Sequence, residues 1–274
     1  MTGSEAHGGV RAVKFEDGWR TDPVYRIDVE PCPKRIRVEF GGEVIADSTD
    51  VLILREQGLL PVYYVPKAAV RMDLMTPTAH RTHCPHKGDA SYWTVSVNGA
   101  TAENAVWGYD DAIPSRAPIA DHVAFYWNEM DRWFEEDEEV FVHARDPRKR
   151  IDIVASHRPV TVALGGQTVA ATSNALFLFE TDLPTRYYIP RDDVRMDLLT
   201  PSESRSRCPY KGEAVYWSLT LGGRTWDHVV WSYPDPVPES ARIKDYLCFF
   251  NEVVDEIAVD GEVQARPQTK WSRE

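Results

Sequence analysis

The chain has 274 residues, of which 43% are hydrophobic and 27% are charged, a composition typical of globular proteins. Its 43 acidic residues outnumber its 31 lysines and arginines, and the net charge of −12 disfavours nucleic-acid binding, because phosphate-binding surfaces are usually basic. Four cysteines do not indicate a disulfide framework, no apolar run is long enough to span a membrane, and residues 1–9 do not resemble a secretory signal. We therefore expect a cytoplasmic protein with neither a membrane nor a nucleic acid as its partner.

The sequence is a tandem duplication. Arg26-Ile27-Asp28 recurs as Arg150-Ile151-Asp152, and every matched pair has the same offset of 124 positions. Residues 22–131 align with 146–255 without a gap, with about 43 identities in 110 positions. The predicted organisation is an N-terminal extension (1–21), a first repeat (22–144), a second repeat (145–267) and a tail (268–274).

In chain order, each repeat reads mostly as short β-strands. The first repeat alternates apolar and polar residues, or is continuously apolar, over 36–40, 43–46, 51–54, 61–66, 92–97 and 101–107. Gly41-Gly42 and Asn98-Gly99 predict tight hairpin turns. From Ile119, and from Ile243 through Ile257, the apolar spacing predicts a C-terminal helix. The expected fold is therefore mainly β (α+β): two tandem antiparallel-sheet domains, each of roughly six to eight strands closed by a helix.

The acidic run at 135–139 follows this predicted helix in the first repeat. We interpret it as a solvent-exposed face or the edge of a linker rather than a metal site.

The longest shared stretch covers residues 63–93 and its twin 187–217. It contains Tyr-Tyr-x-Pro (187–190), Arg-Met-Asp-Leu (195–198) and Cys-Pro-Tyr-Lys-Gly-x-Ala-x-Tyr-Trp (208–217), followed by Trp-Ser-Tyr-Pro (231–234). Because of these motifs, the chain resembles the tandem form of the family named domain of unknown function 427. The resemblance covers residues from about 22 to 267. The first repeat departs from the pattern at His86, Gly108 and Asp110.

The resemblance implies a β-tent-like fold, the class of the B-type methionine sulfoxide reductases and of cereblon's ligand-binding domain. The family is sometimes labelled a nucleotidyltransferase-type domain, a label that implies no defined chemistry. Many β-tent proteins bind zinc through two Cys-x-x-Cys knuckles, but this sequence contains none. His80, His83 and His86 have no counterparts in the second repeat, so we expect no metal and no cofactor.

Two cysteines are shared between the repeats, and each precedes a lysine by three residues. An ammonium group close to a thiol lowers its pKa and favours the nucleophilic thiolate. Cys208 with Lys211, and Cys84 with Lys87, are therefore candidate catalytic pairs. The alternative is that each thiol is a buried, unreactive core group.

Shared arginines and aromatic residues indicate a binding site. Residues i and i+2 of a strand point to the same face, so Arg71 and Asp73 would lie side by side, either as a structural ion pair or as an anion-binding arginine held by its aspartate. The aromatic residues either belong to the core or line a pocket. The candidate ligand-binding residues are Arg195, Asp197, Thr200, Arg205, Tyr188, Tyr216, Trp217 and Trp231, with Arg71, Asp73, Thr76, Arg81, Tyr64, Tyr92, Trp93 and Trp107 in the first repeat.

Three hypotheses follow from these residues. The favoured one is a protein that binds a small anionic or aromatic molecule in an Arg/Lys/aromatic pocket of each repeat. The alternatives are an enzyme with a lysine-activated cysteine, and a structural or protein-interaction module. Because the second repeat is nearer the family pattern, the main site is expected there.

Overall fold

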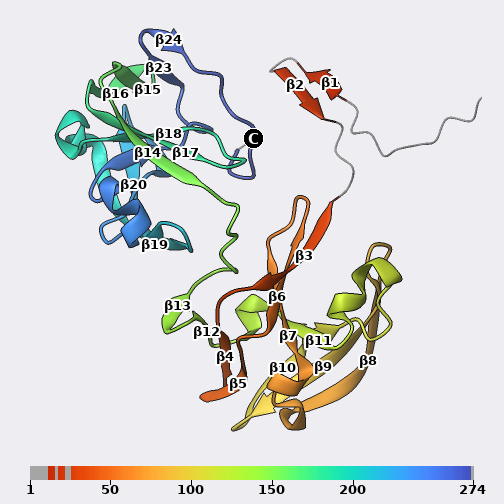
Figure 1. Ribbon diagram of the computed structural model, residues 1–274. Helices are drawn as coiled ribbons and strands as arrows, with labels where there is room; N and C mark the ends of the chain where they lie inside the picture. Colours follow the sequence, from red (N-terminus) through yellow and green to blue (C-terminus); the bar gives the residue numbers. More distant parts are fainter. Residues whose placement is uncertain (1–11, 16–17, 22–25, 273–274) are drawn as a thin grey trace, which may run out of the picture. The chain divides into compact units, whose positions relative to one another are not determined.

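The computed structural model describes residues 12–15, 18–21 and 26–272. Strands β1 (Ala12–Phe15) and β2 (Gly18–Thr21) form a short antiparallel hairpin that precedes the repeats. The chain divides between Ala144 and Arg145 into two compact units, each described by itself below (Figure 1).

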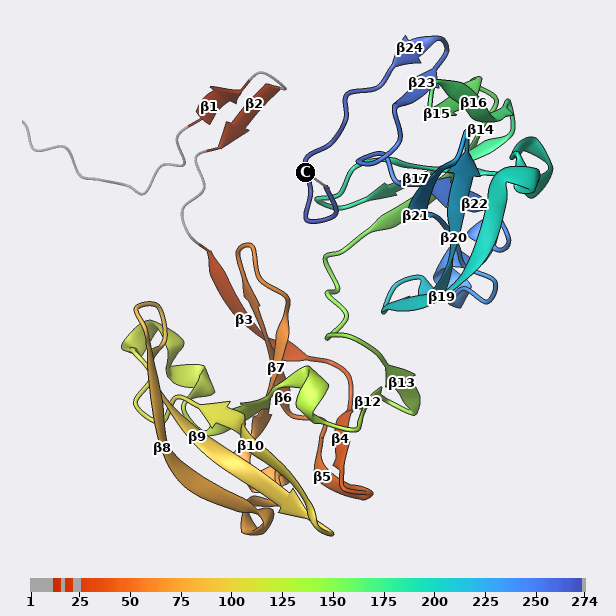
Figure 2. The same cartoon turned by 180° about the vertical axis from the view of Figure 1, so that it is seen from behind.

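Among its described residues, the first unit contains two antiparallel sheets besides the β1–β2 hairpin (Figures 1 and 2). The larger sheet has the order β3-β6-β7-β11-β10-β9-β8 and the smaller has the order β13-β12-β4-β5. The strands are β3 (Ile27–Cys32), β4 (Ile36–Phe40), β5 (Glu43–Ser48), β6 (Val51–Glu56), β7 (Val62–Pro66), β8 (Met75–Cys84), β9 (Gly88–Val97), β10 (Ala100–Gly108), β11 (His122–Phe125), β12 (Arg132–Glu135) and β13 (Glu138–Val140). Short 3-10 helices connect them: η1 (Lys67–Ala69), η2 (Met72–Leu74), η3 (Pro114–Ile119) and η4 (Trp127–Glu129).

The second unit has the same arrangement. Its larger sheet has the order β14-β17-β18-β22-β21-β20-β19 and its smaller sheet the order β16-β15-β23-β24. The strands are β14 (Ile151–Ser156), β15 (Val160–Leu164), β16 (Gln167–Thr172), β17 (Ala175–Glu180), β18 (Arg186–Ile189), β19 (Leu199–Cys208), β20 (Gly212–Leu221), β21 (Arg224–Ser232), β22 (Leu247–Phe249), β23 (Glu256–Val259) and β24 (Glu262–Val263). Its 3-10 helices are η5 (Arg191–Asp193), η6 (Met196–Leu198) and η7 (Pro238–Ile243).

The core of each unit is divided between the two faces of its larger sheet. In β6, Val51 and Ile53 belong to a cluster that also contains apolar residues from β4, β5 and β12. Leu54 and Tyr64 point to the opposite face and join a second cluster, which Ile119 of η3 completes. Both faces of the larger sheet are therefore buried, and this explains why β6 reads as a continuous apolar run.

The predicted hairpins are confirmed. Strands β4 and β5 turn through Gly41 and Gly42, whose φ values are +60° and +80°. Strands β9 and β10 turn through Asn98 and Gly99, whose φ values are +48° and +85°. These left-handed conformations suit the twist of a two-residue hairpin and favour glycine and asparagine.

The C-terminal helix predicted from Ile119, and from Ile243 in the second repeat, is not found, and β11 and β22 lie there instead. Val123 and Phe125 point into the core between the sheets, while Ala124 points to the opposite face. This is the period of two that defines a strand. An apolar run that is buried on both sides does not distinguish a strand from a helix. For this reason the prediction of a helix at this position was wrong.

Glu136, Asp137 and Glu138 of the acidic run are exposed to solvent, as the sequence indicated, but Glu135 is not. Glu135 lies in β12 and is 2% exposed. Its carboxylate accepts a hydrogen bond from the Tyr63 hydroxyl at 2.7 Å and pairs with Lys34. The carboxylate of Glu135 is thus a satisfied core group.

No helix in the described part of the chain has the length and apolar character needed to cross a membrane.

Candidate functional site

The shared Cys-Pro-x-Lys-Gly sequence forms the turn between β8 and β9. The backbone N–H of Lys87 donates to the carbonyl of Cys84 at 3.2 Å. Gly88 follows with φ of +110°, and a Cβ atom at this position would lie 2.9 Å from the carbonyl oxygen of Asp111. Only glycine fits this backbone and this close approach, so the turn accounts for the glycine in the motif.

Each shared lysine forms an ion pair inside its unit. Lys87 and Glu56 are 9% and 8% exposed, and the Lys87 ammonium donates to the Glu56 carboxylate. In the second repeat, Lys211 Nζ lies 2.5 Å from Glu180 Oε2. The neighbouring Cys84 and Cys208 are half-buried. Because each ammonium is already neutralised by a carboxylate, the pairs give no support to a lysine-activated thiol.

The Arg-Met-Asp-Leu motif lies at a 3-10 turn and not on a strand, which corrects the predicted local structure. Arg71 and Asp73 are nonetheless side by side, with Nε–Oδ1 at 2.9 Å and Nη2–Oδ2 at 2.8 Å. Arg195 and Asp197 repeat this contact at 2.8 and 2.7 Å. The hydrogen bond from each arginine lowers the pKa of its aspartate.

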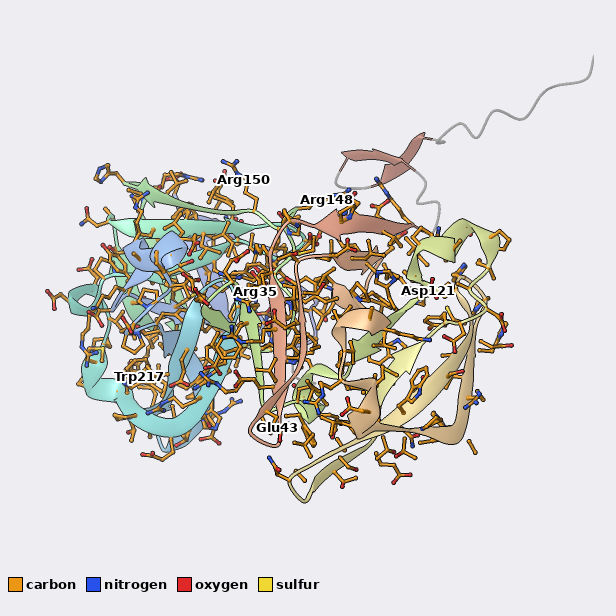
Figure 3. All side chains as sticks on the ribbon, turned by 60° about the horizontal axis from the view of Figure 1, so that its bottom comes forward. Arg35, Glu43, Asp121, Arg148, Arg150 and Trp217 are labelled. Atoms are coloured by element: carbon orange, nitrogen blue, oxygen red, sulfur yellow. The ribbon has the colours of Figure 1, made fainter. Side chains whose placement is uncertain are left out.

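The Arg71–Asp73 pair fastens the turn to the neighbouring hairpin. The backbone N–H of Arg71 donates to the Ile45 carbonyl at 2.8 Å, and its guanidinium lies 3.7 Å from the Glu43 carboxylate. Glu43 lies at the β4–β5 turn (Figure 3). All three charged side chains are exposed. Of the two alternatives considered for Arg71 and Asp73, this geometry matches the structural ion pair rather than an anion-binding arginine.

The second pair of shared arginines lies in a bulge. Arg81 Nη1 donates to the Thr78 and His80 carbonyls at 2.8 and 2.6 Å. Arg205 makes the same two contacts, to Ser202 and Ser204, at 2.9 and 2.8 Å. Each arginine therefore binds the backbone where the register between the edge strand and its neighbour shifts.

The remaining candidates fall on both faces of the larger sheets. Trp93 belongs to the core between the sheets, and Trp217 packs against the equivalent core. Tyr64, Tyr92 and Trp107, with Tyr188, Tyr216 and Trp231, lie in or against the cluster on the other face. Thr76 and Thr200 are exposed near the starts of β8 and β19. The candidate residues are thus not brought together in one Arg/Lys/aromatic pocket.

Burial on this second face raises the pKa of Tyr64 and of Tyr188. The Tyr188 phenol stays protonated and uncharged, because desolvation holds its pKa well above the ordinary value. Trp231 Nε1 donates to its hydroxyl at 3.2 Å. Tyr64 has the same surroundings in the first repeat, with Trp107 as its hydrogen-bond partner. These four residues therefore act as a hydrogen-bonded core.

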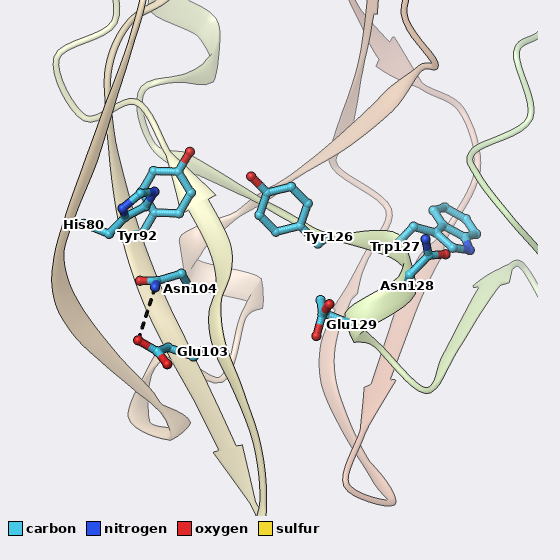
Figure 4. A pocket seen from close by; sticks show the side chains of 8 residues that line it. All are labelled: His80, Tyr92, Glu103, Asn104, Tyr126, Trp127, Asn128 and Glu129. Atoms are coloured by element: carbon cyan, nitrogen blue, oxygen red, sulfur yellow. Dashed lines mark hydrogen bonds between the residues drawn. The ribbon is translucent and has the colours of Figure 1, made fainter.

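An open hollow of about 570 Å³ lies beside the bulge of the first repeat, and we call it the bulge hollow. It is lined by His80, Tyr92, Glu103, Asn104, Tyr126, Trp127, Asn128 and Glu129. Figure 4 shows the residues of β8, β9 and β10 on one side, those of η4 on the other, and Tyr126 between them. The His80 and Tyr92 rings are 4.5 Å apart, and Tyr126 packs on Trp107 at 4.6 Å. Burial and the neighbouring Tyr92 hydroxyl raise the pKa of the Tyr126 phenol.

A backbone irregularity positions the polar side of this hollow. Asn104 adopts φ of +54° where the register between β9 and β10 shifts. Its N–H donates to Thr94 Oγ1 at 3.3 Å, and its side-chain oxygen accepts from Thr78 Oγ1 at 2.6 Å. The bulges of β8 and β10 therefore meet, and together they turn Asn104 toward the hollow.

The second repeat keeps this bulge with different side chains. His228 occupies the Asn104 position, also with φ of +54°. His228 Nδ1 lies 2.9 Å from Ser202 Oγ, and Nε2 lies 3.4 Å from Ser204 Oγ. The Tyr216 hydroxyl is 2.6 Å from Ser206 Oγ. The equivalent surface is thus built from two serines and a histidine.

The chain's last described segment packs on the second repeat at the loop after β22. Arg186 and Glu252 form a buried, bidentate pair with both distances at 2.7 Å. Thr269 donates to Glu252 at 2.7 Å, and the Trp271 ring lies 5.6 Å from the Arg186 guanidinium. The loop after β22 is therefore tied to residues 269–271, which lie in the segment assigned to the tail.

A second hollow of about 520 Å³ lies beside the β8–β9 turn. Its lining residues are Arg81, Thr82, His83, Asp89, Ser91, Asp110 and Asp111. His83 and Asp89 pair there at 2.6 Å, and both are well exposed. Among the described residues, no group of three or more His, Cys, Asp or Glu side chains is arranged to hold a metal ion.

Sequence reasoning missed two groups of residues. Glu56 and Glu180 are identical in both repeats, so the shared-residue criterion could have found them as partners for the lysines. The bulge residues Asn104 and His228 differ between the repeats, and the same criterion excluded them.

The fold and site define a tandem protein of two antiparallel β domains with a duplicated bulge site. The sequence model of the family described as domain of unknown function (DUF427) matches residues 28–136 and 152–260, and the chain belongs to this family. A search of curated proteins found no match.

Proposed function

We propose that the protein binds a small molecule with a flat ring and a cationic or hydrogen-bond-donating group, in the bulge hollow of the first repeat. One observation carries this proposal: Glu103 and Glu129 line the same hollow as the rings of His80, Tyr92 and Tyr126.

The charge of the hollow determines the class of ligand. Glu103 and Glu129 are exposed carboxylates that favour a positive or donating group. Ring faces attract flat apolar groups and cations. The shared cations lie elsewhere, since Lys87 pairs with Glu56 and Arg71 with Asp73. An aromatic ligand therefore remains the proposal, while the anionic ligand expected from the sequence does not suit this hollow.

The size of the hollow is also suitable. Small-molecule sites are commonly about 300–1,000 Å³ and combine apolar walls with a few polar groups. The bulge hollow, at about 570 Å³, lies within this range. Asn104 and Asn128 add amide groups that would orient a bound ring.

The test compares three probes of similar size by isothermal titration calorimetry: phenethylamine, benzyl alcohol and hydrocinnamate. We expect the amine to bind best and the carboxylate to bind least. Glu129→Gln should weaken amine binding about tenfold, equivalent to roughly 1.4 kcal/mol. Asp227→Asn, at the second-repeat position equivalent to Glu103, is the matched control and should leave binding unchanged. Equal binding of all three probes, or no loss in Glu129→Gln, would contradict the proposal.

A further inference from the structure

The second repeat places a serine hydroxyl against an oriented imidazole, independently of the hollow in the first repeat. Ser204 Oγ lies 3.4 Å from His228 Nε2, and Ser202 Oγ lies 2.9 Å from His228 Nδ1. A nucleophile, a base and a third group that orients the base form the general pattern of nucleophilic catalysis. We propose that Ser204 is a nucleophile activated by His228, and that the second repeat cleaves small esters through an acyl-Ser204 intermediate.

The hydrogen bonds around Ser202 are compatible with the imidazole tautomer that the proposal requires. The backbone N–H of Ser204 donates to Ser202 Oγ at 3.0 Å. A hydroxyl oxygen has two lone pairs and can accept a second donor, and in the proposed state this donor is His228 Nδ1–H. Nε2 then carries the free lone pair and faces Ser204 Oγ, as a general base requires. The Nε2–Oγ distance of 3.4 Å is long, but such contacts commonly shorten only when substrate is bound.

The backbone holds these groups in place. His228 lies in the left-handed conformation at the bulge, and its N–H donates to Ser218 Oγ at 3.2 Å. The strand β19 shifts register between Pro201 and Arg205, which brings Ser202 and Ser204 to the same imidazole. Ser204 and His228 are only partly buried, so a small ester can approach them.

The reaction balances with an ester and water as the only reactants. Ser204 Oγ attacks the carbonyl carbon while its proton passes to His228 Nε2. The bond between the carbonyl carbon and the alcohol oxygen then breaks, and the alcohol leaves with the proton from Nε2. Water attacks the acyl-Ser204 ester by the same route, releasing the carboxylic acid and restoring the serine hydroxyl. The guanidinium of Arg205 donates to the backbone carbonyl of Ser204 at 2.8 Å and so holds this residue within the bulge.

The first repeat provides a natural comparison. His80 stands at the position of Ser204 and Asn104 at that of His228, and Thr78 replaces Ser202. Asn104 has the same left-handed backbone and bonds Thr78 at 2.6 Å. The bulge therefore accepts asparagine without distortion, and His228→Asn is expected to fold.

The test uses the full chain, a fluorophosphonate reagent and p-nitrophenyl acetate. The reagent should phosphonylate Ser204 with loss of fluoride, as mapped by mass spectrometry. Ser204→Ala should abolish this adduct, and His228→Asn should slow its formation and ester cleavage by about a hundredfold, the usual contribution of a general base. Ser206→Ala is the matched control, because Ser206 bonds Tyr216 rather than His228, and its rates should be unchanged.

Folding of each variant is checked by circular dichroism. A folded protein with no adduct on Ser204, or an equal labelling rate in His228→Asn, would overturn the proposal.

Discussion

Glu56 in β6 and Lys87 in the β8–β9 turn form an ion pair that is almost completely buried, and Glu180 and Lys211 form the same pair in the second repeat. The turn and the strand are thereby joined across the sheet. A buried pair of charges requires both partners, because removal of one leaves the other desolvated and unpaired.

We expect Glu180→Gln to reduce the free energy of unfolding of the second repeat by about 3–5 kcal/mol, since the Lys211 ammonium would remain buried without a counter-charge. Hydrogen-exchange mass spectrometry can report each repeat separately. The double variant Glu180→Met with Lys211→Met should recover a large part of the loss. A loss in the double variant equal to the sum of the single losses would contradict this account.

Gly212→Ala should destabilise the second repeat by more than about 1 kcal/mol. Gly212 has φ of +102°, and an added Cβ would lie 3.0 Å from the Asp235 carbonyl oxygen. Gly222→Ala is the control, because Gly222 has φ of +58° and no heavy atom within 4 Å of an added Cβ. The two melting temperatures provide the comparison, and an equal decrease in both would argue against close packing at Gly212.

The cysteines should differ in their rate of alkylation by iodoacetamide in the native protein. Burial raises the pKa of Cys248 to about 12 and also raises the pKa of Cys32. Both thiols are buried, so they should remain unmodified at pH 8 until the protein unfolds, while Cys84 and Cys208 react first. Mass spectrometry of peptides from a time course measures each rate. Early modification of Cys248 would be inconsistent with its buried position.

The buried Glu252 should make the second repeat less stable in acid. Desolvation opposes ionisation of Glu252, but hydrogen bonds from Arg186 and Thr269 outweigh it and lower the pKa. A group with a lowered pKa stabilises the fold above its unfolded-state pKa, and this contribution is lost as the pH falls through the folded-state pKa. Between about pH 5 and pH 3, the unfolding free energy should therefore fall more steeply in the wild type than in Glu252→Gln. Glu262→Gln, an exposed control, should keep the wild-type slope.

The sequence was sufficient to predict the duplication and the hairpins, because turn residues and alternation are local signals. It did not predict β8, since most of the side chains of this edge strand, Met75–Cys84, are exposed and show no apolar alternation. It also predicted a helix at β11, where Val123 and Ala124 are buried on opposite faces. The site was harder to predict, because a bulge and a buried Lys87–Glu56 pair depend on contacts between distant strands.

The smaller sheets have a further consequence for synthesis of the chain. Val38 of β4 pairs with Trp133 of β12, and Val162 of β15 pairs with Ile257 of β23. Each smaller sheet thus joins the beginning of a repeat to its end, and such non-local pairing is slow. Val38 and Val162 occupy equivalent positions, so β4 is the counterpart of β15. Strand β4 could therefore pair wrongly with β23, the natural partner of β15. Vectorial synthesis on the ribosome lets β12 reach β4 before β23 exists, whereas refolding of the whole chain from denaturant offers β4 both partners at once.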